Sequence, residues 1–152
     1  MNIPALVFHN ACPPAAIKDN AAFSCNVLDL ALPAWQGVKG ILWLLQLGVT
    51  DKAMAVQKLQ EADAKDSATA LTAASTADVH DFTTKASATD DGEIHALYVP
   101  MDEARKRYQN LALTAGNGTA GTYLSALAIG IGAGNWNGNA ASMGLGNFEQ
   151  RA

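Results

Sequence analysis

The stretch from residue 92 to 132 most constrains the fold, because three alternating apolar segments are separated in it by two polar turns. In the last segment one parity, broken only by Ser125, is apolar, and the other is taken by Leu124 and small residues; the apolar set is Tyr123, Leu127, Ile129 and Ile131. A period of two places the two sets on opposite faces of a β-strand. The stretch therefore predicts strands rather than helices.

The turns predict how these strands are joined. Residues 115–119 (Ala-Gly-Asn-Gly-Thr) are a strong hairpin signal, since Asn and Gly accept positive φ at little cost. We therefore predict a three-stranded antiparallel meander, with strands over 93–101, 107–114 and up to Ile131.

Composition supports an all-β fold for the 152 residues, which suffice for one domain with a real core. Gly, Ala, Asn, Ser and Thr are abundant while Lys and Glu are few, which is typical of β proteins with many tight connections. We divide the chain into an N-terminal extended arm (1–21), a β domain (22–132) and a Gly/Asn-rich C-terminal arm (133–152).

Further strands are expected within the β domain. Residues 40–50 (GILWLLQLGVT) are apolar on both faces, as a central strand of a sandwich would be. Segments 22–32, 54–62 and 78–83 are also predicted as strands, although 54–62 has helical propensity. Residues 63–76 are small and polar and predict a long exposed loop.

The two arms carry apolar residues that need a surface to bind. Three prolines within 1–21 disfavour helix, so we expect an extended segment docked at a sheet edge. The C-terminal arm cannot build its own core. We expect its isolated apolar side chains to find a pocket on the same domain or on a neighbouring subunit; they are Trp136, Met143, Leu145 and Phe148.

Charge and cysteine content narrow the partners. A net charge of −4 and a pI of about 5.2 argue against nucleic acid as a partner. The apolar run 41–45 is too short to cross a membrane, so none is expected as a partner. Cys12 and Cys25 could in principle pair; because no signal peptide is evident at Met1, reduced buried thiols are expected.

No residue pattern predicts an active site, and we expect a non-enzymatic protein without a catalytic, metal or cofactor site. Residues 116–121 have the outline of a dinucleotide-binding loop but stand between two predicted antiparallel strands. The remaining candidates lack recognised spacing: His80 flanked by Asp78 and Asp81, and His80 with His95 near Asp90 or Asp91.

The densest charge cluster is Arg105, Lys106 and Arg107, which follows two acidic residues. It could be a solvated, self-compensated turn or an interface patch that pairs with carboxylates of another subunit. The candidate interface residues are Arg105, Lys106, Arg107, Trp43, Trp136 and Phe148.

Two segments, LLQLGVTDKAMAVQKLQEAD and ATDDGEIHALYVPMDEARKRYQNLALTAGNGTAGTYLSALAI, resemble small virion proteins of tailed bacteriophages. The resemblance covers roughly residues 20–131. Within that group, the chain is similar to the capsid cement, or decoration, proteins. It implies an antiparallel, jelly-roll-like β-sandwich that binds the outside of a phage capsid and clamps neighbouring major capsid subunits, as a dimer or trimer. The protein would be made in the host cytoplasm and reside on the capsid surface.

A rival hypothesis is a carbohydrate- or receptor-binding β-sandwich module of a phage fibre or tail. In that case Trp35, Trp43 and Trp136 would supply a face for stacking on sugar rings. A hydrolase that uses His80 is a third alternative, and no motif supports it.

Overall fold

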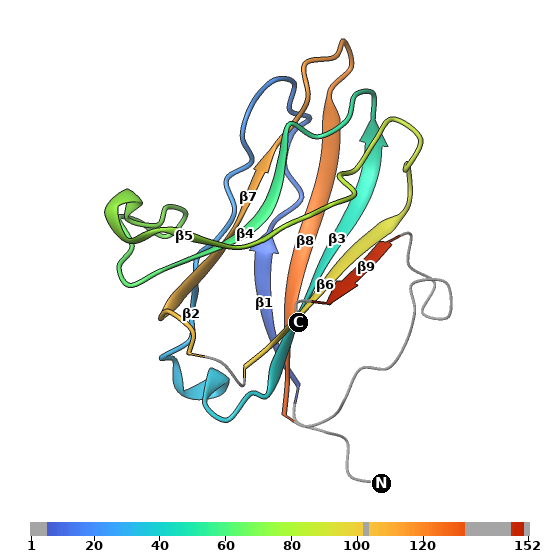
Figure 1. Cartoon of the computed structure of the whole chain (residues 1–152). Helices are drawn as coiled ribbons and strands as arrows, with labels where there is room; N and C mark the ends of the chain where they lie inside the picture. The colour runs from blue at the N-terminus through green and yellow to red at the C-terminus, as the bar shows by residue number, and fades with distance from the viewer. Residues whose placement is uncertain (1–5, 102–103, 133–146, 151–152) are drawn as a thin grey trace, which may run out of the picture.

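The computed structural model describes residues 6–101, 104–132 and 147–150, and the chain is all-β (Figure 1). The strands are β1 (Leu6–Cys12), β2 (Leu28–Asp29), β3 (Gly40–Thr50), β4 (Val56–Ala62), β5 (Ala77–Asp81), β6 (Ile94–Pro100), β7 (Tyr108–Thr114), β8 (Thr122–Ile131) and β9 (Asn147–Gln150). Two short 3-10 turns, η1 (Pro33–Trp35) and η2 (Ala73–Ser75), complete the elements. Within the described ranges no helix is long and apolar enough to cross a membrane.

The strands form two sheets. One has the order β1-β8-β3-β6-β9 and the other the order β2-β7-β4-β5. Neighbouring strands are antiparallel except for β9, which pairs with β6 in parallel. We call the side of each sheet that faces the other its inner face, and the opposite side its outer face.

The inner faces share one hydrophobic core, because alternate residues of strands in both sheets are buried together. The five-stranded sheet contributes Ile41, Trp43, Leu45, Leu97, Val99 and Leu124, and the four-stranded sheet contributes Leu28, Leu59, Val79, Leu111 and Leu113. The alternation of β8 separates two faces, but its buried set is Leu124, Ala126 and Ala128, whereas Leu127 and Ile129 lie on the outer face. The inner-face residues of β3 and β7 are buried against the opposite sheet.

The predicted meander is wrong, although the bounds of its three strands are nearly right. β6 and β8 lie in the five-stranded sheet with β3 between them, whereas β7 lies in the other sheet. The loop 115–121 therefore carries the chain from one sheet to the other instead of closing a hairpin. Its positive φ, 81°, occurs at Gly121 and not at the Asn-Gly pair.

The other strand predictions have mixed outcomes. Residues 40–50 form a strand flanked on both sides, by β8 and β6, and residues 54–62 and 78–83 largely become β4 and β5. The predicted strand 22–32 is wrong except for the two residues of β2.

The alternation of residues 22–32 still indicates which side chains are buried, since Phe23, Cys25 and Val27 all are. The backbone there changes partners too quickly to form a ladder. Phe23 N donates to Leu113 O, Asn26 N to Ala11 O and Val27 N to Ala68 O.

Both ends of the chain contribute strands to the five-stranded sheet. β1 lies at its edge beside β8, as expected for a docked N-terminal segment. β9 pairs with β6 through its backbone, and Figure 1 shows it at the other edge. The C-terminal arm otherwise falls outside the described residues, including Trp136 and the side chain of Phe148.

Candidate functional site

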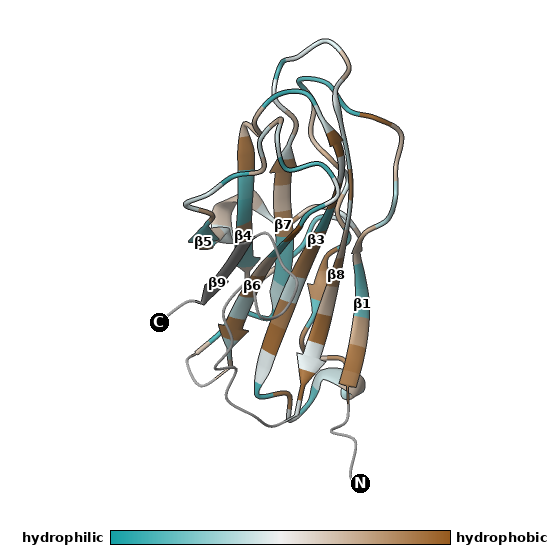
Figure 2. Ribbon diagram, turned by 90° about the vertical axis from the view of Figure 1, so that its right-hand side faces the viewer, coloured by the Kyte–Doolittle hydropathy of each residue, from teal (hydrophilic) through white to brown (hydrophobic). Residues whose placement is uncertain are grey.

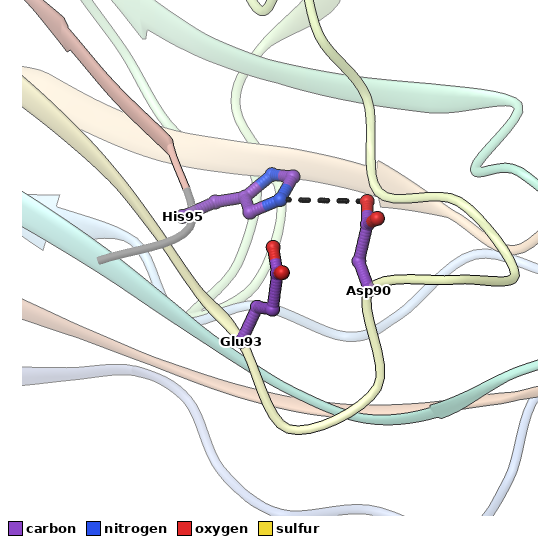
Figure 3. A group of neighbouring side chains, drawn as sticks. All are labelled: Asp90, Glu93 and His95. Carbon is purple, nitrogen blue, oxygen red and sulfur yellow. Dashed lines mark ion pairs between the residues drawn. The ribbon is translucent and has the colours of Figure 1, made fainter. Parts of the chain in front are cut away.

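A small polar cluster lies at the start of β6, where Asp90, Glu93 and His95 converge (Figure 3). One ligand atom from each residue lies within 4.8 Å of the others. His95 points into the core and is only 1% exposed, and its Nε2 is 3.6 Å from Asp90 Oδ2. A buried imidazole with two carboxylates is a possible donor set for a divalent cation such as Zn²⁺.

The buried side chain of Gln57, on β4 of the other sheet, determines which nitrogen of His95 is protonated. Gln57 Oε1 accepts a hydrogen bond from Ala86 N at 2.7 Å. Because a backbone N–H can only donate, the Gln57 amide is oriented with its Nε2 toward His95 Nδ1, 3.2 Å away. Nδ1 must then accept, so the neutral imidazole carries its proton on Nε2 and donates toward Asp90.

This arrangement opposes metal binding at the cluster. Metal-bound histidines coordinate through one nitrogen and donate a hydrogen bond from the other. If His95 Nε2 bound an ion, a proton on Nδ1 would face the donor amide of Gln57. Rotating that amide would bring its NH₂ group against Ala86 N. The cluster is better described as a polar link between the two sheets.

Asp90 is held as an acceptor by its own turn. Ser87 N donates at 2.8 Å, and hydroxyls of Ser87 and Thr89 donate at 2.9 and 3.2 Å. Burial alone would raise the pKa of Asp90, but these hydrogen bonds and the nearby His95 hold the pKa below its usual value. An ionised, fully hydrogen-bonded carboxylate is poorly suited to act as a general acid or base.

The candidate base His80 is not part of this cluster. It lies on β5, where its ring packs edge-on against Phe82 with the ring centroids 5.5 Å apart. Its flanking carboxylates bind lysines: Asp78 pairs with Lys58 at 2.9 Å and Asp81 with Lys85 at 3.6 Å. The structure thus brings His95 and Asp90 together, and His80 is not a member of the group of possible metal ligands among the described residues.

The loop 115–121 binds carboxylates of its own chain, where a phosphate site was considered. Asp51 Oδ2 accepts hydrogen bonds from Thr119 N at 2.6 Å and from Ala120 N, and Asp19 Oδ1 accepts from Gly118 N at 2.7 Å. The N–H groups of Ala120 and Thr119 hold the pKa of Asp51 below its usual value. A side chain at Gly118 would collide with the Asp51 carboxylate, which explains a glycine there. Successive N–H groups do form an anion nest, and Asp51 fills it.

The cations of residues 105–107 pair with acidic residues of the same chain. The side chain of Arg105 is 4% exposed and its Nη1 lies 3.9 Å from Glu61, while Lys106 Nζ lies 3.1 Å from Asp63. Arg107 donates two hydrogen bonds, each 2.9 Å long, to the carboxylate of Asp29 and thereby lowers its pKa. Their role at an interface stays a prediction, and a partner would meet cations that are already paired.

The tryptophan predictions need correction. Trp43 was proposed as an interface residue, but its side chain is 0% exposed in the core, because inner-face positions of β3 pack against the other sheet. Trp35 is also buried, so neither ring can stack on a sugar. This removes the face on which the carbohydrate-binding alternative depended, apart from Trp136, which lies outside the described residues.

The feature that sequence reasoning missed is the outer face of the five-stranded sheet. It carries a second apolar layer, hereafter the outer apolar face, whose members are Leu6, Phe8, Leu42, Leu44, Ala96, Tyr98, Leu127, Ile129 and Ile131. Figure 2 shows hydrophobic residues along β3 and β8 and in the first part of β1. The both-face apolarity of 40–50 was the available signal for this layer.

Strand register aligns this layer across four strands. Phe8 is paired with Ile129, Ile129 with Leu42, and Leu42 with Tyr98. Exposure rises along the row, from 6% at Tyr98 and Leu42 to 59% at Phe8. The row therefore ends in an exposed aromatic side chain at the β1 edge.

A hollow of about 250 Å³ opens beside this row, and its lining includes Pro14, Leu44, Ile94 and Leu127. Its size and apolar walls suit an inserted side chain.

The outer face of the four-stranded sheet is different, because polar residues cover it. Lys58 and Gln60 both donate hydrogen bonds to Asp78, at 2.9 and 2.7 Å. A groove of about 520 Å³ crosses this face, and its described lining residues, among them Asn110 and Thr114, are all uncharged. The two outer faces thus offer distinct surfaces, one apolar and one polar.

No protein-family model, curated protein or solved structure matches the chain.

Proposed function

We propose that this chain is a non-enzymatic structural protein of a tailed-phage virion, which binds the outside of the capsid and cements neighbouring major capsid subunits. We further propose that its two sheets form a jelly-roll-like β-sandwich with extended arms. The protein would be made in the host cytoplasm, reside on the capsid surface, and bind neither nucleic acid nor membrane. The outer apolar face is the observation that supports this best.

An apolar outer face is unusual for a sheet whose other face already covers a core. A monomeric domain normally solvates the second face of an antiparallel sheet with polar residues. Here the outer positions of β1, β3, β6 and β8 include no Asp, Glu, Lys or Arg. Depletion of charge around exposed aromatic and aliphatic groups is the composition of an interface centre.

The exposed part of this face indicates where a partner would bind. Leu6 and Phe8 on β1 are 45% and 59% exposed. β1 is also an edge strand, and an unpaired edge can add a strand from a partner. We propose that a capsid subunit or a second copy of this chain covers this corner, with the chain acting as a dimer or trimer. Many such modest contacts on one shell would sum through multivalency.

The test is whether the protein binds heads through this face. Empty heads would be assembled from the major capsid protein of the same phage, mixed with the purified full chain, and imaged by cryo-electron microscopy. We expect density for the chain on the outer surface. A particle surface that stays bare at saturating protein would overturn the proposal.

Matched variants identify the face that binds. Phe8→Glu places a charge on the outer apolar face and should reduce head binding at least 10-fold. Leu32→Glu changes a residue of similar exposure, 50%, in the turn before η1, and should leave binding unchanged. Equal binding by both variants would show that another surface is used.

A further inference from the structure

The two cysteines meet inside the core. Cys12 ends the edge strand β1, and Cys25 lies in the extended segment that precedes β2. Their side chains are 0% and 1% exposed, both are free thiols, and both belong to the same hydrophobic cluster. Thirteen positions separate them in sequence, yet the fold brings them side by side.

Hydrogen bonds that do not involve the sulfur atoms hold the two segments together. Asn26 N donates to Ala11 O at 2.6 Å, and Asn26 Nδ2 donates to Asn10 O at 2.8 Å. His9 Nε2 lies 3.1 Å from Asn26 O on the same stretch. Three interactions therefore hold residue 26 against residues 9–11, which places Cys25 next to Cys12.

The two thiols have unequal chemistry. Contact with the Cys25 thiol lowers the pKa of Cys12. The same contact, together with burial, raises the pKa of Cys25. Cys12 is thus the sulfur that reaches the nucleophilic thiolate form first.

We propose that Cys12 and Cys25 are a redox modification site, at which a low-molecular-weight disulfide such as oxidised glutathione converts the two thiols into an intramolecular disulfide. The Cys12 thiolate attacks one glutathione sulfur, the glutathione disulfide breaks, and one glutathione thiolate leaves. Cys25 then loses its proton to solvent and attacks the Cys12 sulfur, which expels the second glutathione as its thiolate. Two cysteine thiols are oxidised, and one glutathione disulfide is reduced to two thiols.

The bond would fasten the edge strand that carries Leu6 and Phe8. The segment between the two cysteines is largely exposed and forms no regular strand, and its hydrogen bonds to the rest of the chain include two between Lys18 and Thr122, one from Asn20 N to Gly116 O and one from Phe23 N to Leu113 O. Local opening of this segment gives an oxidant access to the buried sulfurs. A cross-link across the resulting short loop restricts the unfolded chain. The proposal stands independently of the capsid role.

The experiment uses the purified full chain, incubated with oxidised glutathione over a series of sub-denaturing urea concentrations. Free thiols are then alkylated, and the protein is digested with trypsin. Lys18 lies between the cysteines, so a disulfide joins peptide 1–18 to peptide 19–39. We expect this cross-linked pair, an intact mass lower by two hydrogen atoms, and a Tm higher by roughly 6–12 °C. Dithiothreitol should reverse all three changes.

Single-thiol variants supply the control. Cys12→Ser and Cys25→Ser can each form a mixed disulfide with glutathione but no internal bond, so neither should gain thermal stability. The proposal is overturned if the wild-type chain carries two glutathiones or forms intermolecular dimers. It is equally overturned if both wild-type thiols remain alkylatable under conditions that glutathionylate the serine variants. Should a variant fail to fold, the peptide map of the wild-type chain decides alone.

Discussion

The two sheets have similar inner faces and opposite outer faces, although one chain builds both. Inside, each contributes apolar residues to one core. Outside, the four-stranded sheet carries the Lys58–Asp78–Gln60 network, whereas the five-stranded sheet presents aligned residues such as Phe8, Ile129 and Leu42. The core between the sheets involves only the inner faces, whereas part of the outer apolar face stays exposed, with Phe8 at 59%. Substitutions on the two faces should therefore affect different measurements.

The largest effect is expected at the inner face. Trp43→Ala should lower the free energy of unfolding by about 3–5 kcal/mol, because a fully buried indole leaves a large cavity. Urea denaturation followed by circular dichroism measures the change. Trp43→Phe is the matched control and should cost much less, since no described residue accepts a hydrogen bond from Trp43 Nε1. Equal losses for the two variants would contradict this account of the core.

The next largest loss of stability is expected at the Gln57–His95 link between the two sheets. Gln57→Leu removes the partner of both Ala86 N and His95 Nδ1. We expect a loss of about 3 kcal/mol, since leaving a buried polar group unpartnered costs about 1–3 kcal/mol.

NMR gives an independent check of the same link. The wild-type chain should show the tautomer of His95 with its proton on Nε2. Gln57→Glu should instead favour protonation of both ring nitrogens, because a carboxylate can accept from Nδ1–H. A proton on Nδ1 in the neutral wild-type ring would refute the hydrogen-bond assignment.

A smaller loss of stability is expected at Gly40, where the ring of Tyr98 packs closely on the backbone of β3. A methyl group at Gly40 would collide with the ring of Tyr98, which lies over β3. Gly40→Ala should therefore destabilise the chain by about 1–2 kcal/mol through overpacking. Adding Tyr98→Leu should recover part of that loss. Strict additivity in the double-mutant cycle would show that the two residues do not interact.

The smallest effect concerns the exposed Asp51 nest and appears as a pH dependence. The pKa of Asp51 is lowered in the folded chain, so its contribution to stability is present above its unfolded pKa of about 3.9. That contribution is lost as the pH falls through the lower folded pKa. Asp51→Asn should thus be less stable than wild type near neutral pH, and the gap should close below about pH 4. A gap that is constant with pH would mean that the carboxylate charge does not matter.

The sequence predicts strand positions far better than strand partners. The alternation of residues 122–131 locates β8, because a period of two separates two faces of a strand, and the continuous apolar run of residues 40–50 locates β3. Periodicity carries no information about which strand lies alongside, so β7 was assigned to the wrong sheet. The Asn-Gly signal misled for a related reason, since the same turn residues also suit a loop that wraps a carboxylate such as Asp51.

The candidate site was less predictable still. His95 owes its protonation state to Gln57, 38 positions away, and no local motif reveals such a pairing. Trp43 was misjudged because an apolar residue in a strand with two apolar faces does not disclose which face it occupies. The outer apolar face emerges only when register aligns Phe8 with Ile129, near the two ends of the domain.

The central place of β8 also affects how the protein is made. β1 and β3 both pair with β8, which comes near the end of the domain. The apolar β3 segment therefore leaves the ribosome long before β8 has been synthesised. Until then β3 is unpaired on that side and could associate with other chains. Folding dominated by such distant pairings is slow. Translation rate and chaperone supply should consequently limit the yield of native protein more than its final stability does.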